Sequence, residues 1–209
     1  MIINTTCLTN FNNCGGTIML RHLILMLAVC VFSTAIAEEK SSAAVKEKML
    51  TISYGDVSMD VENVNADTSG WRINALYETG AKGGNVLHGF SIGYIETKAD
   101  YTFGGQTTHY KLKSLPIYYA PIILFGKKAF KGFLKGALGM HLSDYNRSGA
   151  LGSIDTSDAG FYGGASAGAM FMFNEKVFAN IEYEWAYLSN SYYRDGEVTS
   201  AMIGIGARF

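Results

Sequence analysis

The last nine residues, 201–209, constrain the fold of this chain more than any other segment. They read Ala-Met-Ile-Gly-Ile-Gly-Ala-Arg-Phe. Alternate side chains of an extended strand point to opposite faces, so the odd-numbered residues form one apolar face. Met202, Gly204, Gly206 and Arg208 form the other face, which is small or charged. This pattern, with an aromatic last residue, is typical of the closing strand of a transmembrane β-barrel.

The amino-terminal segment predicts export. An apolar run, Leu23–Val31, follows Arg21 and leads to Ala35–Ala37, after which the chain becomes charged. A basic residue, a short apolar run and a small-x-small site form the pattern of a cleaved secretory signal peptide. The run is too short for a comfortable transmembrane helix.

These patterns divide the chain into four parts. Residues 1–18 fit poorly before a signal peptide, so we expect translation to begin at Met19 rather than Met1, with 1–18 a mis-assigned upstream start. We predict a signal peptide at 19–37, a periplasmic segment at 38–47 and a barrel domain at 48–209.

The composition of the mature chain agrees with this division. All three cysteines precede residue 38, so residues 38–209 have no disulfide framework. These residues carry 16 of the 17 Lys and Arg and all 18 Asp and Glu, a net charge of −2. That balance does not favour nucleic acid as a partner. Abundant glycine and aromatic residues with only two prolines suit many strands.

Eight segments show an alternation of apolar and polar residues. Four longer polar connections join the first segment to the second, the third to the fourth, the fifth to the sixth and the seventh to the eighth. The segments lie at about 48–62, 71–78, 86–97, 108–124, 129–143, 160–173, 179–187 and 201–209. The polar connections are Asn63–Ser69, Ala99–Gln106, Tyr145–Asp158 and Ser189–Glu197. We predict an all-β fold, an eight-stranded antiparallel up-and-down transmembrane β-barrel in the outer membrane, with the polar connections on the outer surface.

Two segments are irregular. In the first, Leu50 and Ile52 share one parity while Val57 and Met59 share the other, which predicts a bulge near Gly55-Asp56. In the fourth, two prolines remove ladder donors, so we expect a strand with a local irregularity.

Aromatic residues are expected at both lipid interfaces. Trp71, Trp185 and Tyr187 lie near the predicted outer rim, and Phe171, Phe173, Phe130 and Phe209 near the inner rim.

The eight segments, the four polar connections and the terminal Gly204-Ile-Gly-Ala-Arg-Phe209 resemble the small outer-membrane barrels of the opacity, attachment-invasion and OmpX type. The resemblance covers residues 48–209. It implies that Phe209 is the signal read by the barrel-assembly machinery. The family includes adhesins, complement-resistance factors and proteins without known activity, so it does not specify a function.

The strand parities predict a polar lumen with charges of both signs. In a barrel this narrow we expect these charges to pair and to plug the lumen rather than to form an ion path. The predicted inward-facing residues are Arg72, Glu78, Lys111, Lys113, Lys131, Lys135, Glu182, Glu184 and Arg208.

One pair permits an enzymatic interpretation. His141 and Ser143, two residues apart with Asp144 adjacent, could suit a lipid A deacylase, but the predicted parity turns the pair inward, away from lipid. No phosphate loop, zinc motif or calcium loop appears, so we expect no enzyme, cofactor or metal site.

We therefore predict a structural or surface-interaction role, such as adhesion to a host surface, carried by the extracellular loops. A narrow small-solute or ion channel is the alternative, and a lipid A-modifying enzyme is third. Expected partners are outer-membrane lipid and lipopolysaccharide, the assembly machinery through Phe209, and a host-surface or envelope ligand, with no nucleic acid.

Overall fold

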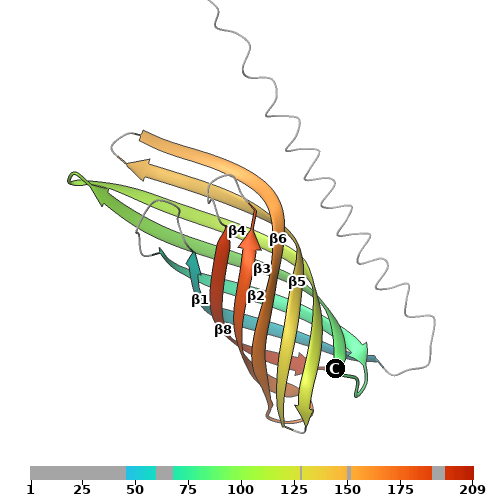
Figure 1. Cartoon of the computed structure of the whole chain (residues 1–209). Helices are drawn as coiled ribbons and strands as arrows, with labels where there is room; N and C mark the ends of the chain where they lie inside the picture. The colour runs from blue at the N-terminus through green and yellow to red at the C-terminus, as the bar shows by residue number, and fades with distance from the viewer. Residues whose placement is uncertain (1–45, 60–67, 128, 150–151, 190–195) are drawn as a thin grey trace, which may run out of the picture. The chain divides into compact units, whose positions relative to one another are not determined.

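The computed structural model describes residues 46–59, 68–127, 129–149, 152–189 and 196–209. The predicted signal peptide and both candidate start residues lie outside them. The described residues form eight antiparallel strands in a closed barrel, each paired with the next and β8 with β1 (Figure 1). The strands are β1 (Lys46–Met59), β2 (Thr68–Ala81), β3 (Val86–Phe103), β4 (Gln106–Lys127), β5 (Phe130–Gly149), β6 (Gly152–Met172), β7 (Val177–Leu188) and β8 (Glu197–Arg208).

The barrel closes through the carboxy-terminal strand β8, which pairs with the first strand, β1. Strand β8 pairs with β1 from Met49↔Arg208 to Met59↔Val198. Backbone hydrogen bonds of 2.9 and 3.2 Å between Phe209 and Lys48 extend this seam. Ile203 and Ile205 are at least 60% exposed on the outer face, while Met202 is 3% exposed inside. The predicted alternation of β8 is therefore confirmed.

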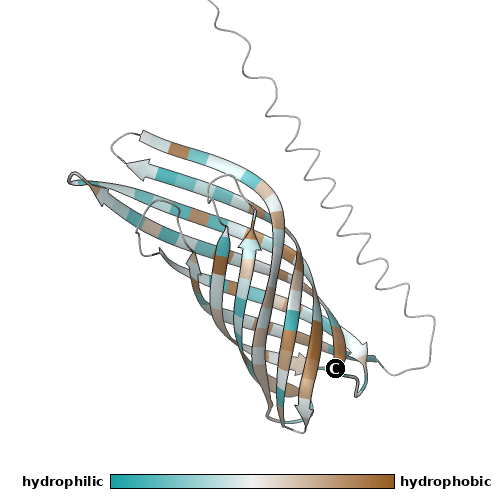
Figure 2. Cartoon of the chain, viewed as in Figure 1, coloured by the Kyte–Doolittle hydropathy of each residue, from teal (hydrophilic) through white to brown (hydrophobic). Residues whose placement is uncertain are grey.

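The outer wall of the closed barrel is apolar, as a lipid environment requires. Leu138, Ile181 and Ile203 are each at least 60% exposed. In Figure 2 hydrophobic segments recur along the closed barrel, whereas hydrophilic segments predominate along the hairpins that extend beyond it. Within the described residues, no helix is long and apolar enough to cross a membrane.

Rings of aromatic side chains mark the two ends of this wall. Trp71 lies between Tyr54 and Tyr94, with ring centroids 6.3 and 5.3 Å away. At the end that holds the chain terminus, Phe171 and Phe173 meet edge to face with centroids 5.4 Å apart. Trp185 and Tyr187 also face outward and are partly exposed. These positions agree with two interfacial girdles.

Two hairpins continue far beyond the closed barrel, β3–β4 and β5–β6 (Figure 1). Pairing of β2 with β3 ends at Thr68↔Ala99, and pairing of β6 with β7 begins at Tyr162↔Leu188. Beyond these points β3, β4, β5 and β6 pair only with one another, which makes a four-stranded sheet. We call residues 100–103, 106–113, 143–149 and 152–160 the protruding sheet.

The protruding sheet corrects two predicted loops, 99–106 and 145–158, because most of their residues extend strands. The first hairpin turns in two residues, Gly104 and Gly105, at φ of 58° and 78°. A turn with positive φ at both central residues matches the twist of the flanking strands and favours glycine at both.

The predicted bulge in β1 is absent. Pairing from Lys46↔Ala81 to Val57↔Gly70 is continuous, and Val57 and Met59 are buried inside the barrel. The apolar residues of β1 change parity in the sequence because, near Val57 and Met59, the side chains inside the lumen are apolar as well. The irregularity in β4 is confirmed: pairing with β3 is interrupted at Pro116, and pairing with β5 at Pro121.

Candidate functional site

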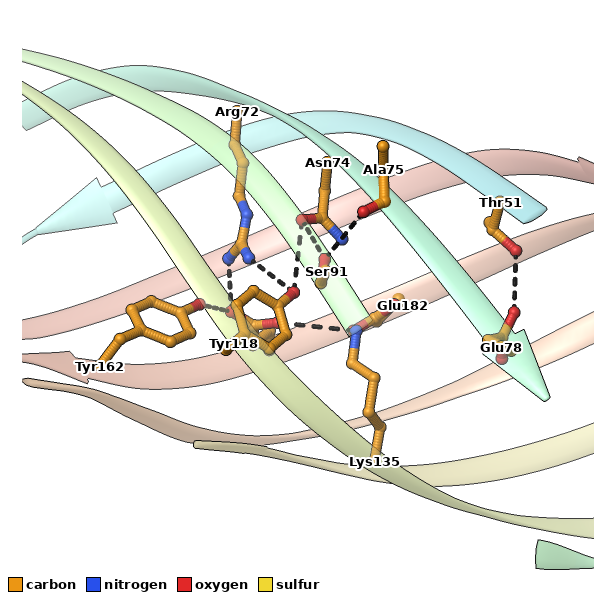
Figure 3. A network of polar contacts seen from close by, with 11 residues as sticks. Thr51, Arg72, Asn74, Ala75, Glu78, Ser91, Tyr118, Lys135, Tyr162 and Glu182 are labelled. Atoms are coloured by element: carbon orange, nitrogen blue, oxygen red, sulfur yellow. Dashed lines mark hydrogen bonds and ion pairs between the residues drawn. The ribbon is translucent and has the colours of Figure 1, made fainter. Parts of the chain in front are cut away.

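The centre of the lumen holds a bonded network of charged side chains (Figure 3). Arg72 on β2 reaches across to Glu184 on β7, and both side chains are at most 1% exposed. The Tyr162 hydroxyl donates to the same Glu184 oxygen. Arg72 also donates to the Tyr118 hydroxyl at 3.1 Å. The guanidinium and the carboxylate therefore form a buried ion pair with two phenols as hydrogen-bonded neighbours, as buried charges require.

Lys135 on β5 is the second buried cation. It forms an ion pair with Glu182 and lies 3.7 Å from the second oxygen of Glu184. Lys135, Ser166 and Glu184 are direct ladder partners across β5, β6 and β7, so the barrel wall fixes their proximity.

Uncharged hydrogen bonds extend the network along β2. Ser91 donates to Asn74 Oδ1 at 2.7 Å and to the Ala75 carbonyl at 3.1 Å. Separate from this network and closer to the carboxy-terminal end of the barrel, Thr51 donates to Glu78 at 3.1 Å.

Apolar side chains fill the lumen on both sides of this network, which residue patterns did not predict. One group lies toward the protruding sheet and comprises Val57, Met59, Ile95, Leu112, Leu188 and Val198. The other lies toward the terminal end and comprises Met49, Leu76, Leu87, Leu124, Phe133, Met170 and Phe178. The lumen is thus a packed core with a charged middle, as an eight-stranded barrel permits.

The predicted inward orientation is wrong for two residues. Lys111 and Lys113 lie on the outer face of β4, because Leu112 between them is buried inside. The prediction took charge to mean inward, but these lysines lie beyond the outer aromatic girdle, where the outer face meets water. Tyr118, which has the same parity as Leu112, is also buried inside the barrel.

Two further residues of the predicted lumen set, Lys131 and Arg208, face inward at the rim near the carboxy-terminus. Arg208 pairs with Glu47 and remains partly exposed. Lys131 is half-buried, and no partner of its side chain was found among the described residues. The structure thus brings Arg72, Lys135, Glu182 and Glu184 into one network and leaves Lys131 and Arg208 outside it. The two phenols of the network, Tyr118 and Tyr162, were missed because a tyrosine in an alternating strand also suits the lipid face.

Lys111 and Lys113 instead join a cationic cluster on the outer face. Glu96 lies 3.0 Å from Lys111 and 3.3 Å from Lys98, and it accepts a 3.2 Å hydrogen bond from Tyr94. Lys113 is its direct ladder partner. Hydrogen bonding, chiefly from Lys111, holds the pKa of the Glu96 carboxyl below its usual range. Three lysines thus gather just beyond Trp71 and Tyr94.

His141 and Ser143 face the interior as predicted. His141 Nδ1 lies 2.7 Å from Ser143 Oγ, and Nε2 lies 2.8 Å from the Ser189 carbonyl oxygen. Asp144 is on the opposite face, where it accepts a hydrogen bond from Ser157. The three residues therefore do not form a lipid-facing triad. Among the described residues, no cluster of three or more His, Cys, Asp or Glu side chains could hold a metal ion.

The protruding sheet has one face rich in aromatic side chains. This face continues the inner face of the barrel. Tyr110 and Arg147 are ladder partners at its centre, and the rings of Tyr110 and Tyr145 are 6.4 Å apart. Phe103 is 76% exposed and Ile154 46% exposed. The opposite face carries Lys111 and Asn146 at the corresponding positions.

Comparison with known proteins supports this architecture. No family model and no curated protein matches the sequence. Among solved structures, the chain is similar to the attachment invasion locus protein Ail of Yersinia pestis, with 19% identity over 78% of this chain and 98% of that chain and a TM-score of 0.52. It is also similar to Neisserial surface protein A, with 16% identity over 80% of this chain and 100% of that chain and a TM-score of 0.51.

The fold is therefore that of the small eight-stranded outer-membrane β-barrels. This confirms the predicted fold class, and with the apolar outer wall it supports the predicted outer-membrane location.

Proposed function

We propose that the protein is an integral outer-membrane barrel that serves a surface-interaction role, such as adhesion, through the protruding sheet. The observation that carries this proposal is the aromatic face around Tyr110 and Arg147, with Phe103 76% exposed. Tyrosine and arginine dominate binding hot spots, and exposed apolar side chains gathered on one face mark interaction sites. Lys46, where the described residues begin, and Phe209 both lie at the opposite end of the barrel, so the protruding sheet is the extracellular end of such a barrel.

Replacement of both Tyr110 and Arg147 by serine should reduce binding of protein-expressing cells to their target surface about tenfold or more, since hot-spot truncations cost over about 1 kcal/mol each. The measurement is cell adhesion to arrays of immobilised glycans and matrix proteins, with and without the protein. The matched control is the His109→Ser, Asn146→Ser variant, which alters neighbouring positions of the same two strands on the opposite face. Equal loss in both variants, or none in either, would contradict the role of this face.

The alternative function is a narrow channel. Apolar groups on both sides of the Arg72–Glu184 network fill the lumen. We therefore expect the purified protein to show no resolvable single-channel conductance in planar bilayers. Discrete conductance steps from properly folded protein would favour the channel instead.

We also propose two partners that bind parts of the protein other than the protruding sheet. The cluster of Lys98, Lys111 and Lys113 just beyond the outer girdle suits the anionic phosphates of lipopolysaccharide. The Phe209 side chain is 66% exposed at the terminal rim, where the assembly machinery could read it.

A further inference from the structure

Glu78 is the one buried carboxyl of the lumen for which no cation partner was found among the described residues. Its side chain is 3% exposed, and the hydrogen bond found for it comes from the Thr51 hydroxyl. The two buried cations are engaged elsewhere: Arg72 with Glu184, and Lys135 with Glu182 and Glu184. Figure 3 shows Glu78 and Thr51 apart from that network.

The charges of the buried network balance without Glu78. The buried acidic and basic side chains of the described residues are Arg72, Glu78, Lys135, Glu182 and Glu184. Two cations and two paired carboxylates sum to zero, so an ionised Glu78 would leave a net negative charge inside the barrel. His141, the buried histidine of the described residues, bonds to Ser143 and the Ser189 carbonyl and to none of these five. Uncompensated charge in a low-dielectric interior is strongly unfavourable.

An acceptor beside Glu78 lacks a hydrogen-bond donor, the side-chain oxygen of Asn180. A cavity of about 10 Å³ lies beside it, lined by Thr51, Lys135, Asn180 and Glu182, and by apolar side chains that include Leu76 and Phe133. Asn180 is 8% exposed, and its Oδ1 has no hydrogen-bond partner among the described residues. A cavity of this size holds about one water molecule. A neutral carboxyl would supply the missing donor, directly or through such a molecule.

We propose that Glu78 is a proton-binding site of the folded barrel: it is a neutral carboxylic acid at neutral pH, and the adjoining cavity takes one water-sized ligand that relays its hydrogen bond toward Asn180. Folding then takes up one proton from solvent, because glutamate in the unfolded chain is ionised at neutral pH. The groups that face the site are Thr51 on β1, Lys135 on β5, and Asn180 and Glu182 on β7. Ionisation of Glu78 would add a third negative carboxylate to a lumen whose two buried cations, Arg72 and Lys135, are already paired with Glu182 and Glu184.

Infrared spectroscopy of the barrel in lipid vesicles at pH 7 tests this directly. The parent protein should show the carbonyl stretch of a protonated carboxyl. Glu78→Gln should abolish the band. The control variant Glu96→Gln removes a carboxylate on the outer face, leaves the charge balance of the lumen unchanged, and should retain the band. Thr51→Ala keeps the carboxyl but removes its hydroxyl donor, so it should shift the band, which assigns it even if Glu78→Gln fails to fold. A parent spectrum without the band, or a band unaffected by the Glu78 and Thr51 changes, overturns the proposal.

The pH dependence of unfolding gives a second test. The native state would bind one proton that the unfolded state lacks, so stability falls as pH rises. Above about pH 5.5, the unfolding equilibrium constant of the parent should rise about tenfold per pH unit relative to Glu78→Gln, until Glu78 ionises in the folded state. Parallel pH profiles for the two proteins would show that Glu78 is already ionised in the barrel.

Discussion

Replacement of Glu184 by glutamine should lower the free energy of unfolding by about 3–5 kcal/mol, the usual loss when one partner of a buried ion pair is removed. Glutamine keeps an acceptor for the Tyr162 hydroxyl, so the loss comes from charge: Arg72 remains buried without its carboxylate, and Lys135 keeps only Glu182. Reversible denaturant unfolding in lipid vesicles measures the change.

A double-mutant cycle separates pairing from packing. Arg72→Met alone should also be strongly destabilising, because it leaves a carboxylate in excess. The double variant retains the balanced Lys135–Glu182 pair, so its loss should fall short of the sum of the single losses by about 0.5–3 kcal/mol. Ser200→Ala is the matched control, since Ser200 is the ladder partner of Glu184 and its hydroxyl has no partner among the described residues. Additive losses in the cycle would mean that Arg72 and Glu184 are not coupled.

The strand alternation was predictable because the wall of a membrane barrel separates two very different environments. In β2, β7 and β8 the outward residues meet lipid and the inward ones meet the packed lumen. Trp71 and Tyr183 lie on the outer face, and the predicted outward face of Ile203 is confirmed. The same rule failed for Lys111 and Lys113. Beyond the girdle of Tyr54, Trp71 and Tyr94, water replaces lipid outside, so a charged side chain no longer marks the inner face.

The length of the protruding strands was missed although the sequence carries a signal for it. Phe103-Gly-Gly-Gln106 has the two central glycines of a tight hairpin, and this favours strands that continue to the turn over an open loop. The polar composition of these segments suggested loops. Strands that extend into water need no apolar face toward lipid, so they can be as polar as loops.

The partners within the lumen could not be predicted from residue patterns. Alternation indicates that Arg72, Lys135 and Glu184 face inward, but which ones meet depends on how far each strand is staggered against the next. Arg72 and Glu184 are 112 residues apart and belong to strands that are not neighbours. Their contact is a property of the closed barrel, and so is the isolation of Glu78.

Replacement of Tyr183 by arginine tests the other half of the architecture, the lipid-facing wall. Tyr183 is 59% exposed on the outer face of β7, between the outer aromatics Trp185 and Tyr187 and the terminal-end aromatic Phe171. Its ladder neighbours are Ala167 and Ala201, which offer no polar group to a guanidinium. A charge near the bilayer midplane should cost about 2–4 kcal/mol in the free energy of unfolding in lipid vesicles. Ser153→Arg in the protruding sheet is the control and should change stability by less than about 0.5 kcal/mol, because that position is exposed to water. Equal effects of the two substitutions would mean that the outer face of β7 does not meet the hydrocarbon core, and the membrane-spanning assignment of that wall would then be wrong.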